Sequence, residues 1–552
     1  MLAIAACIAV ASSATAAERP NIVIVMVDDM GFSDIGCYGG EVRTPHLDAL
    51  AAGGVRFSQF YNTGRCCPTR ASLLTGLYSH EAGIGWMTGD QKTPGYIGRL
   101  NDRCVTIAEV LGQAGYFTVM TGKWHVGFNH GVTPWGRGFA RSLNLPAGGL
   151  HFWDQTGSKG DTKVFLNGEE IARDDPQLGP PWYAADLFTE QGLRFVDEVI
   201  AAEQPFFWYL AHTAPHFPCM APKDTIAEYR GRYQDGWDAL REQRYARQKE
   251  LGLISEDWTL HPRPEAIPAW NSLAPKQQKR YDDMMAIYAA MIAEVDASIG
   301  RLVAALDERG QLENTLVLFL SDNGGNAETG VKGRYEGEHP GDAHSNVFIG
   351  QCWAHLNNTP FRRYKHFNHE GGIATPLIAH WPAAIAARPG AEEWITTPAH
   401  VIDLMATCVD LAEADYPKQV DGRDIVPMQG ESLRPLLTGR GSLPSRPLYW
   451  EHEGNAAVRV GDRKLVRRGQ GPWELYDLAS DRTEQHDLAA DHPDEVAQLT
   501  RQWRTWARRS QVLPKPPAKK SKKKAGRSSS DRTKNTPEAP TKREAAAEGT
   551  AS

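Results

Sequence analysis

Two pairs of oxygen-bearing side chains follow two apolar runs that lie far apart in the sequence. The run NIVIVMV ends in Asp28 and Asp29, and the run TLVLFL is followed closely by Asp322 and Asn323. Three carboxylates and one amide oxygen are hard donors that suit Ca²⁺ or Mg²⁺, whereas zinc prefers nitrogen and sulfur. A cation would also offset the repulsion among three carboxylates in one crevice. Each pair alone could instead cap a helix or form a turn, so a metal site requires the two pairs to converge.

Two adjacent cysteines stand where a helix is expected to begin. In the stretch GRCCPTRASLLTG, Pro68 suits the first turn of a helix whose apolar side is formed by the following alanine and leucines. Free N–H groups and the helix dipole at such a start favour an anion. Cys66 would lie just before this turn and Arg70 one turn further on, which places a nucleophile beside an anion. The alternative is a pair of buried thiols, or a disulfide from one of them to Cys37 or Cys104.

The order of the surrounding elements predicts an α/β layer fold. Apolar residues recur at helical spacing from Met284 to Leu306, and Gly310 follows as the expected C-cap ahead of the run TLVLFL. The segment 106–127 has the pattern helix, glycine, strand and loop, and 204–218 has the pattern strand and loop. Runs that are apolar throughout are typical of parallel strands buried on both faces. Because ligands bind at the carboxyl ends of such strands, these loops should converge on one face.

Composition and patterning divide the 552 residues into four parts. The chain is 41% hydrophobic and 23% charged, which is sufficient to bury a large core. Residues 1–17 are apolar and then small, which is typical of a secretory signal and predicts export to the periplasm or the medium; a buried N-terminal strand is the alternative. Residues 18–440 form the expected catalytic domain. Residues 441–512 change to short alternating strands and an amphipathic stretch, which predicts a small antiparallel sheet with a closing helix. No run after the signal is long and apolar enough to span a bilayer.

The remaining part, 513–552, is a basic tail. From residue 514 onward there are eleven Lys and Arg against four Asp and Glu, a net charge of +7. Because the whole chain has a net charge of −7, the residues before 514 have a net charge of −14. The tail is rich in Pro, Ser, Lys and Ala and is predicted to be disordered. Weak contact with an anionic polymer or envelope surface is one role for it, and a solvated extension without a partner is the alternative. No nucleic-acid partner is expected.

The cysteine count also sets Cys66 apart. The chain has eight cysteines, and removal of the signal would leave seven. In an exported protein an odd number predicts either a free reactive thiol or one cysteine that is chemically diverted.

Six blocks of the sequence together resemble the sulfatase family. Cys66 to Arg70 is similar to the signature C-x-P-S/T-R, and the blocks NIVIVMVDDMGFSDIGCYGG, GKWHVG, APHFP, SDNGG and HEGGIATP look like sulfatase blocks in the family's order. The likeness runs from about Pro20 to Leu488 and is to bacterial arylsulfatases in particular. It implies the alkaline-phosphatase-like α/β fold, with a large mostly parallel sheet flanked by helices and a smaller C-terminal antiparallel sheet with a helix.

The resemblance also implies a cofactor set. A separate maturation enzyme would oxidise Cys66 to formylglycine, the residue 3-oxoalanine, and Cys67 would be only the variable position of the motif. The hydrated aldehyde would attack sulfur through one hydroxyl and release the sulfate by deprotonation of the other. One Ca²⁺ ion would be held by Asp28, Asp29, Asp322, Asn323 and the modified Cys66.

The remaining roles follow from the same resemblance. Arg70 and Lys123 would steady the nucleophile and the carboxylates, and His125 would take the proton that triggers sulfate release. His216 and Lys365 would bind sulfate and protonate the leaving oxygen, and Lys123 would also contact the substrate. His212 and His366 are close competitors for these roles, and His216 is preferred because prolines flank it as in the family.

The predicted function is therefore calcium-dependent hydrolysis of an aryl or carbohydrate sulfate ester. One alternative is a phosphonate monoester or phosphodiester hydrolase of the same superfamily, and another is a non-catalytic binder of sulfated glycans in which Cys66 stays a thiol. Trp86, Trp124, Trp153, Trp182 and Tyr183 either line a cleft for aromatic or sugar rings or serve as packing residues.

Overall fold

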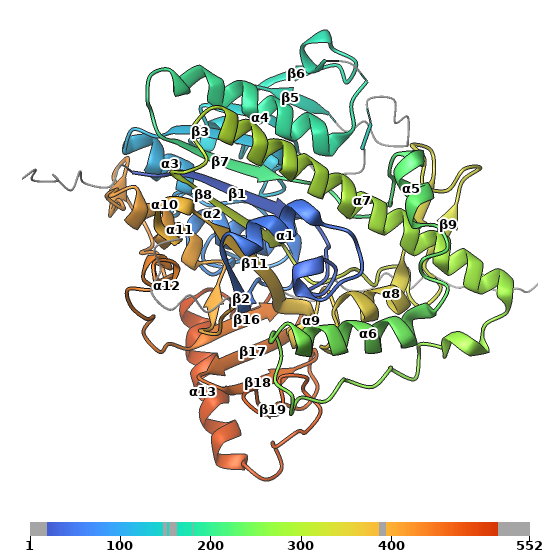
Figure 1. The fold of residues 1–552 in the computed structure, drawn as a ribbon. Helices are drawn as coiled ribbons and strands as arrows, with labels where there is room; N and C mark the ends of the chain where they lie inside the picture. Colours follow the sequence, from blue (N-terminus) through green and yellow to red (C-terminus); the bar gives the residue numbers. More distant parts are fainter. Residues whose placement is uncertain (1–18, 147–151, 154–162, 180, 386–393, 517–552) are drawn as a thin grey trace, which may run out of the picture. The chain divides into compact units, whose positions relative to one another are not determined.

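A large, mostly parallel sheet forms the centre of the structure (Figure 1). The computed structural model describes residues 19–146, 152–153, 163–179, 181–385 and 394–516. The predicted secretory signal at 1–17 and the tail beyond 516 lie outside the described residues, so both stay predictions.

The central strands of the sheet run parallel, and the antiparallel pairs lie toward its two sides. The order across the sheet is β12 (Trp394–Ile395), β2 (Val55–Tyr61), β11 (Ala374–His380), β8 (Thr315–Ser321), β1 (Asn21–Val27), β7 (Phe206–Ala211), β3 (Phe117–Lys123), β4 (Arg141–Leu145), β5 (Val164–Leu166) and β6 (Glu169–Ile171), and β13 (Ala399–His400) also pairs with β2. All neighbours from β8 to β4 are parallel, whereas β11, β5 and β6 pair antiparallel with their neighbours. The edge strands β12 and β13 pair parallel with β2. This arrangement confirms the predicted fold class.

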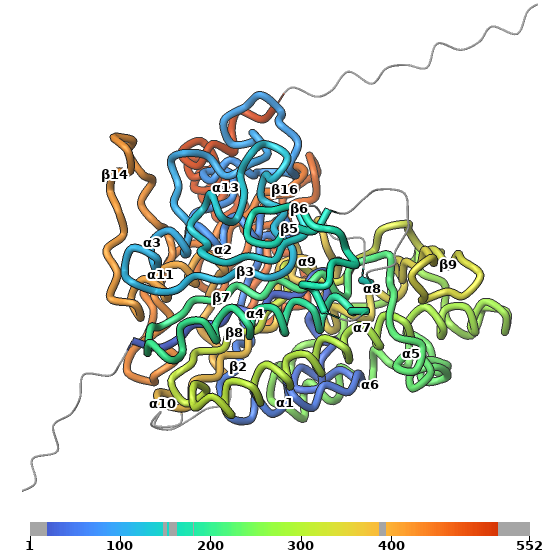
Figure 2. Tube along the Cα trace, turned by 90° about the horizontal axis from the view of Figure 1, so that it is seen from above, coloured from blue at the N-terminus to red at the C-terminus, as the bar shows by residue number. Residues whose placement is uncertain are grey.

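Strand β1 is buried on both faces because helices cover both sides of the sheet. Val23 and Val25 point into one core, and Ile22 and Ile24 point into the other. The first core is closed by α1 (Pro45–Ala52), α4 (Ala184–Ile200) and α7 (Pro275–Glu308), and the second by α2 (Cys66–Thr75), α3 (Ile107–Gln113), α11 (Asp403–Leu411) and α12 (Arg434–Leu437). Figure 2 shows α1, α4 and α7 on one side of the strands and α2, α3 and α11 on the other.

The other elements connect these layers. The helices are α5 (Lys223–Tyr229), α6 (Gly236–Glu250), α8 (Gly350–Asn357), α9 (Glu370–Ile373) and α10 (Pro382–Ile385), and the short strands are β9 (Arg334–Glu336), β10 (Asn346–Phe348), β14 (Gln419–Val420) and β15 (Arg423–Asp424). The long helix α7 begins with Pro275 and is capped at its end by Arg309. The expected cap residue Gly310 follows one position later with φ of 64°, the left-handed conformation that terminates a helix. Among the described helices none is both long and apolar enough to cross a membrane.

The C-terminal region forms the expected small antiparallel sheet. It contains β16 (Leu448–His452), β17 (Asn455–Val460), β18 (Arg463–Arg467) and β19 (Glu474–Asp477), and α13 (Pro493–Arg509) covers one face. Tyr449 stacks on Trp506 of that helix with ring centroids 4.9 Å apart, while Trp450 points the other way into the core of the large sheet. Alternation along β16 therefore fixes the small sheet between α13 and the rest of the molecule.

A buried ion network joins the small sheet to the large one. Glu370, at the start of α9, accepts hydrogen bonds from Lys464 of β18 at 2.7 Å, from Arg482 at 2.8 Å and from Tyr61 of β2 at 2.9 Å. Glu484 also pairs with Lys464 at 2.9 Å, and all five side chains are buried. Although burial opposes ionisation, Lys464 and Arg482 lower the pKa of Glu370 to about 2. Glu370 therefore stays ionised and paired with residues of the C-terminal region.

Replacement of Glu370 by Gln should destabilise the protein strongly. The change leaves Lys464 and Arg482 buried with one carboxylate between them, and breaking a buried pair costs about 3–5 kcal/mol. Urea unfolding followed by tryptophan fluorescence measures the loss. The control is Glu170→Gln, which breaks the exposed Lys163–Glu170 pair and should give no measurable change. Equal stability of both variants would contradict a structural role for the network.

Candidate active site

The two oxygen-bearing pairs meet at the carboxyl edge of the large sheet. Strands β1 and β8 are parallel neighbours with Val27 opposite Ser321, so the residues that follow them lie side by side. The backbone N–H of Asp29 donates to Asp322 Oδ1 at 3.3 Å, and Asn323 Nδ2 donates to Asp29 Oδ1 at 2.7 Å. Asp28, Asp29, Asp322 and Asn323 are all fully buried. The convergence required for a metal site is therefore present.

The protein's own groups leave part of this donor set unsatisfied. Asp28 Oδ1 and Asn323 Oδ1 are buried and have no hydrogen-bond partner among the described residues. Burial raises the pKa of Asp28, and burial together with the charge of Asp28 raises the pKa of Asp322 to about 8. A hard divalent cation would bind the oxygens that lack partners, and its charge would favour ionisation of these carboxyl groups. These four residues fit such an ion.

Three cationic side chains from different segments surround the carboxylates. Lys123, the last residue of β3, donates to Asp28 Oδ2. Arg70 of α2 donates to Asp322 Oδ2 at 2.8 and 3.1 Å, with Asp28 Oδ2 at 3.7 Å. Lys365 pairs with Asp29 at 2.7 Å. Each cationic side chain of the buried site thus contacts a carboxylate, and the attraction between these opposite charges stabilises the arrangement.

Cys66 lies at the first turn of α2, as its first residue and not just before it. Its sulfur, the sulfur of Cys67 and a ring nitrogen of His125 lie within 4.8 Å of one another. The interaction with the Cys67 thiol, together with the charge of Lys123, holds the pKa of Cys66 well below its ordinary value despite burial. The disulfide alternative is wrong for the part of the chain that the structure describes, because Cys66, Cys67, Cys37 and Cys104 are all free.

Two histidines face this centre in their neutral form. His125 has φ of 56°, and burial together with the charge of Lys123 lowers its pKa to about 4. His216 Nδ1 lies 2.6 Å from the carbonyl oxygen of Phe217, and its Nε2 lies 3.5 Å from Asp29 Oδ2. Burial lowers the pKa of His216 to about 4 as well. The neutral ring therefore keeps its proton on Nδ1 and presents the Nε2 lone pair toward the carboxylates.

The competing histidines lie elsewhere. His212 is buried with Nε2 3.4 Å from Ser298 Oγ on α7. His366 contacts Glu328 at 3.4 Å and Glu453 at 2.8 Å, at the outer side of Lys365. The structure therefore places His216, and not His212 or His366, beside Asp29.

Two further residues of the site were missed from the sequence. Asn326 Nδ2 donates to Asp29 Oδ2 at 2.7 Å, and Tyr209 accepts a hydrogen bond from Arg70 at 3.3 Å. Asn326 follows Asn323 within the same polar loop, which is a signal that could have found it. Tyr209 lies inside the apolar strand β7, where it is indistinguishable from a core residue.

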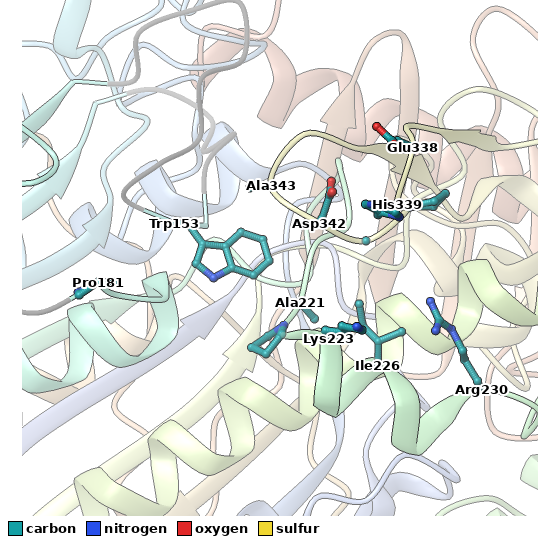
Figure 3. Close-up of a pocket in the computed structure, with 13 residues that line it drawn as sticks. Trp153, Pro181, Ala221, Lys223, Ile226, Arg230, Glu338, His339, Asp342 and Ala343 are labelled. Carbon is teal, nitrogen blue, oxygen red and sulfur yellow. The ribbon is translucent and has the colours of Figure 1, made fainter.

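A cavity of about 760 Å³ lies beside the segment that follows His216. Figure 3 shows Trp153 on one side of it and Asp342 and His339 on the other, with Lys223 and Arg230 on the floor. The other aromatic residues considered for a cleft have different surroundings. Three of them donate hydrogen bonds to backbone oxygens: Trp124 to Val132, Trp182 to Arg173 and Tyr183 to Met220. The fourth, Trp86, donates to the side chain of Glu453.

The fold and the buried site define a hydrolase of the alkaline-phosphatase-like α/β class. The sulfatase family model matches residues 20–414, and the model for the C-terminal region of N-sulphoglucosamine sulphohydrolase matches 362–509. The chain belongs to the sulfatase family and is a sulfuric ester hydrolase.

Relatives of known sequence and structure agree with this assignment. The chain is 37% identical over 434 residues to an arylsulfatase of Klebsiella aerogenes, covering 75% of this chain and 91% of that protein. It is 34% identical over 536 residues to an uncharacterized sulfatase of Schizosaccharomyces pombe, covering 90% and 95%. The crystal structure of Ps i-CgsB in complex with a neocarrahexaose superposes with a TM-score of 0.65 at 25% identity, covering 89% and 93%.

His125 and His216 should titrate far below the ordinary histidine range. Because their neutral forms are favoured, both rings should stay neutral above about pH 5 in metal-free protein, with midpoints near pH 4. Glu328 and Glu453 raise the pKa of His366 against its burial, so its midpoint should lie above the ordinary value. Nitrogen NMR of labelled histidines measures all three, with single His→Gln variants for assignment. A midpoint near pH 6.5 for His216 would contradict this electrostatic description.

Proposed function

We propose that this sulfuric ester hydrolase uses a formylglycine hydrate made from Cys66 and one Ca²⁺ ion to hydrolyse an aryl or carbohydrate sulfate. The observation that supports the proposal most is the position of Cys66. Its side chain lies at the first turn of α2 beside His125 and Lys123, and it interacts electrostatically with Asp28, Asp29 and Asp322. A nucleophile generated there adjoins both the metal-type donors and the cations.

The two groups would supply the chemistry that side chains lack. Formylglycine hydrate would provide one hydroxyl to attack sulfur and a second whose deprotonation expels the sulfate, while Ca²⁺ would offset the charge of the nucleophile and of a sulfate oxygen. Asp28, Asp29, Asp322 and Asn323 would hold the ion, using the two oxygens that lack partners.

Arg70 and Lys123 position the acidic residues. Arg70 contacts Asp322 through two nitrogens and donates to the backbone oxygen of Lys123 at 3.2 Å, so it ties α2 to the ends of β8 and β3. Lys123 contacts Asp28 and remains charged because the attraction of Asp28 exceeds the cost of burial and raises its pKa. Both cations therefore fix the carboxylates and attract the anionic ester.

Lys365 and His216 serve the leaving group and the sulfate. Burial opposes the charge of Lys365, yet Asp29 raises its pKa, so its Nζ is a protonated donor. His216 is neutral and holds its Nε2 toward the same carboxylate. Lys365 thus binds a sulfate oxygen and donates a proton to the leaving oxygen, and His216 binds the sulfate once its Nε2 has taken up a proton, which it can then pass to the leaving oxygen.

His125 is the base for the release step. Its ring interacts with the side chain of Cys66, its Nδ1 has no partner among the described residues, and its low pKa keeps it neutral at pH 7. A neutral ring next to the nucleophile can accept a proton when sulfate leaves.

The substrate assignment rests on the relatives and on the cavity. One relative is called arylsulfatase, and a solved neighbour holds a neocarrahexaose, a carbohydrate. The cavity beside the His216 segment offers an indole face at Trp153 with charged side chains at Lys223, Arg230 and Asp342, a combination suited to the ring and hydroxyls of a sugar. The same proposal includes a separate maturation enzyme that oxidises Cys66 and export of the chain to the periplasm or the medium. It also includes weak contact of the basic tail with an anionic surface or polymer.

The state of Cys66 and the reaction it supports are tested together. Mass spectrometry of the Cys66 peptide, from protein made in its native host, should show CHO in place of CH₂SH at Cys66 and an intact thiol at Cys67. Cys66→Ala should lower turnover of an aryl sulfate by on the order of 10⁴-fold, whereas Cys67→Ala should retain most of it. Faster turnover of an aryl phosphonate would favour the phosphonate hydrolase alternative. If both cysteines stay thiols and the protein binds sulfated glycans without turnover, the alternative of a non-catalytic glycan-binding protein would be favoured.

Calcium should stabilise the protein through Asp322. At 100 times the dissociation constant, Ca²⁺ should add about 2.7 kcal/mol and raise Tm by about 2–3 °C. Asp322→Asn should abolish this rise because it removes a buried carboxylate donor. The matched control Asp296→Asn, which changes a largely buried carboxylate that binds the backbone of His46 and Leu47, should keep the rise. An equal rise in all three proteins would exclude this calcium site.

A further inference from the structure

A second set of metal-type ligands lies at the outer side of the active site. His366 directly follows Lys365, His452 is the last residue of β16, and Glu453 begins the turn to β17. The ligand atoms of these three side chains lie within 4.8 Å of one another. The set joins the loop of Lys365 to the C-terminal sheet, and it shares no residue with the carboxylate site.

His452 has surroundings that packing alone does not explain. Its side chain is 0% exposed, and neither ring nitrogen has a hydrogen-bond partner among the described residues. The nearest acidic atom, Glu453 Oε1, lies 3.7 Å from Nε2, which is beyond hydrogen-bond distance. Leaving a buried polar group without a hydrogen-bond partner destabilises the folded state. Burial lowers the pKa of His452 to about 4, so the ring has a free lone pair.

The other two ligands are held by their own partners. His366 Nδ1 lies 2.8 Å from Glu453 Oε2, while Glu328 Oε1 lies 3.4 Å from His366 Nε2. Trp86 Nε1 donates to Glu453 Oε1 at 3.2 Å. In metal sites, a carboxylate that contacts a ligating histidine, as Glu328 contacts His366, orients that ligand. A hydrogen-bond donor to a ligating carboxylate, such as Trp86 to Glu453, has the same effect.

We propose that His366, His452 and Glu453 bind a divalent cation of the zinc class, separate from the hard-oxygen site at Asp28. Two imidazoles and one carboxylate are a three-ligand set that zinc accepts, with a fourth position left for water or another ligand. The side chains of His366 and Glu453 are 26% and 35% exposed, so the fourth position opens to solvent at the rim of the active site.

Binding requires a small contraction and one side-chain movement. Bonds of about 2.0–2.1 Å in a tetrahedral site bring ligand atoms to roughly 3.4 Å from one another. Arg65 Nη1 now contacts the His366 ring and must move away from it, and the partner that it can keep after this movement is Glu328, which it contacts at 3.2 Å. Glu328 and Glu453 contribute two negative charges that offset the ion and Arg65.

The test measures metal binding by the untagged full-length protein with its calcium site saturated. Zn²⁺ titrated by calorimetry should bind, and Co²⁺ should give the visible absorption of a nitrogen and oxygen site without sulfur charge transfer. His452→Ala and Glu453→Gln should each weaken binding by at least tenfold. Trp86→Phe should weaken it less, because it removes only an outer contact. His355→Ala is the matched control, since His355 is equally buried with both nitrogens unpartnered, and it should bind like wild type.

Two results would overturn the proposal. One is unchanged Zn²⁺ affinity in His452→Ala and Glu453→Gln. The other is loss of binding in Cys67→Ser with a sulfur band in the Co²⁺ spectrum, which would assign the ion to Cys66, Cys67 and His125. Circular dichroism confirms that each variant is folded, and if His452→Ala does not fold, the Trp86→Phe and Glu453→Gln variants decide.

Discussion

The organisation of this molecule depends on placing three carboxylates together in a fully buried site. Asp28, Asp29 and Asp322 converge because β1 and β8 are parallel neighbours that end at the same level. Burial makes each negative charge costly, so cations must come from elsewhere. The three cations come from three different segments: Arg70 from α2, Lys123 from β3 and Lys365 from the loop before α9. Because each contacts a carboxylate, the positions of these segments depend on the charges of the site as well as on packing in the core. Even with these cations the pKa of Asp322 stays high.

The C-terminal sheet is part of this arrangement. Glu370 lies at the end of the loop that carries Lys365, and it is held by Lys464 and Arg482 from the C-terminal region. His452 and Glu453, at the turn between β16 and β17, lie against the same loop. The small sheet thus holds one side of the active site through charged contacts, in addition to the apolar contact made by Trp450.

The fold and the central residues of the site could be predicted from local patterns, and the supporting network could not. Apolar runs that end in polar residues predict both the buried strands and the residues at their carboxyl ends, which is why Asp28 and Asp322 were found. Lys464 and Arg482 resemble exposed charges in a strand and a loop, because only tertiary pairing with Glu370 makes their burial possible. Tyr209 likewise fits the pattern of a core strand, and its contact with Arg70 depends on how β7 packs against α2.

The burial of Cys66 has a consequence for the order of events in the life of the chain. The residue is 2% exposed, within a helix whose every residue is buried. A modifying enzyme needs access to the backbone and side chain at this position, and the folded molecule offers neither. The two cations that hold Glu370, Lys464 and Arg482, are synthesised several hundred residues after Cys66. On the proposed function, chemical maturation therefore belongs to the interval in which the nascent chain has emerged but the C-terminal sheet has not yet closed the structure.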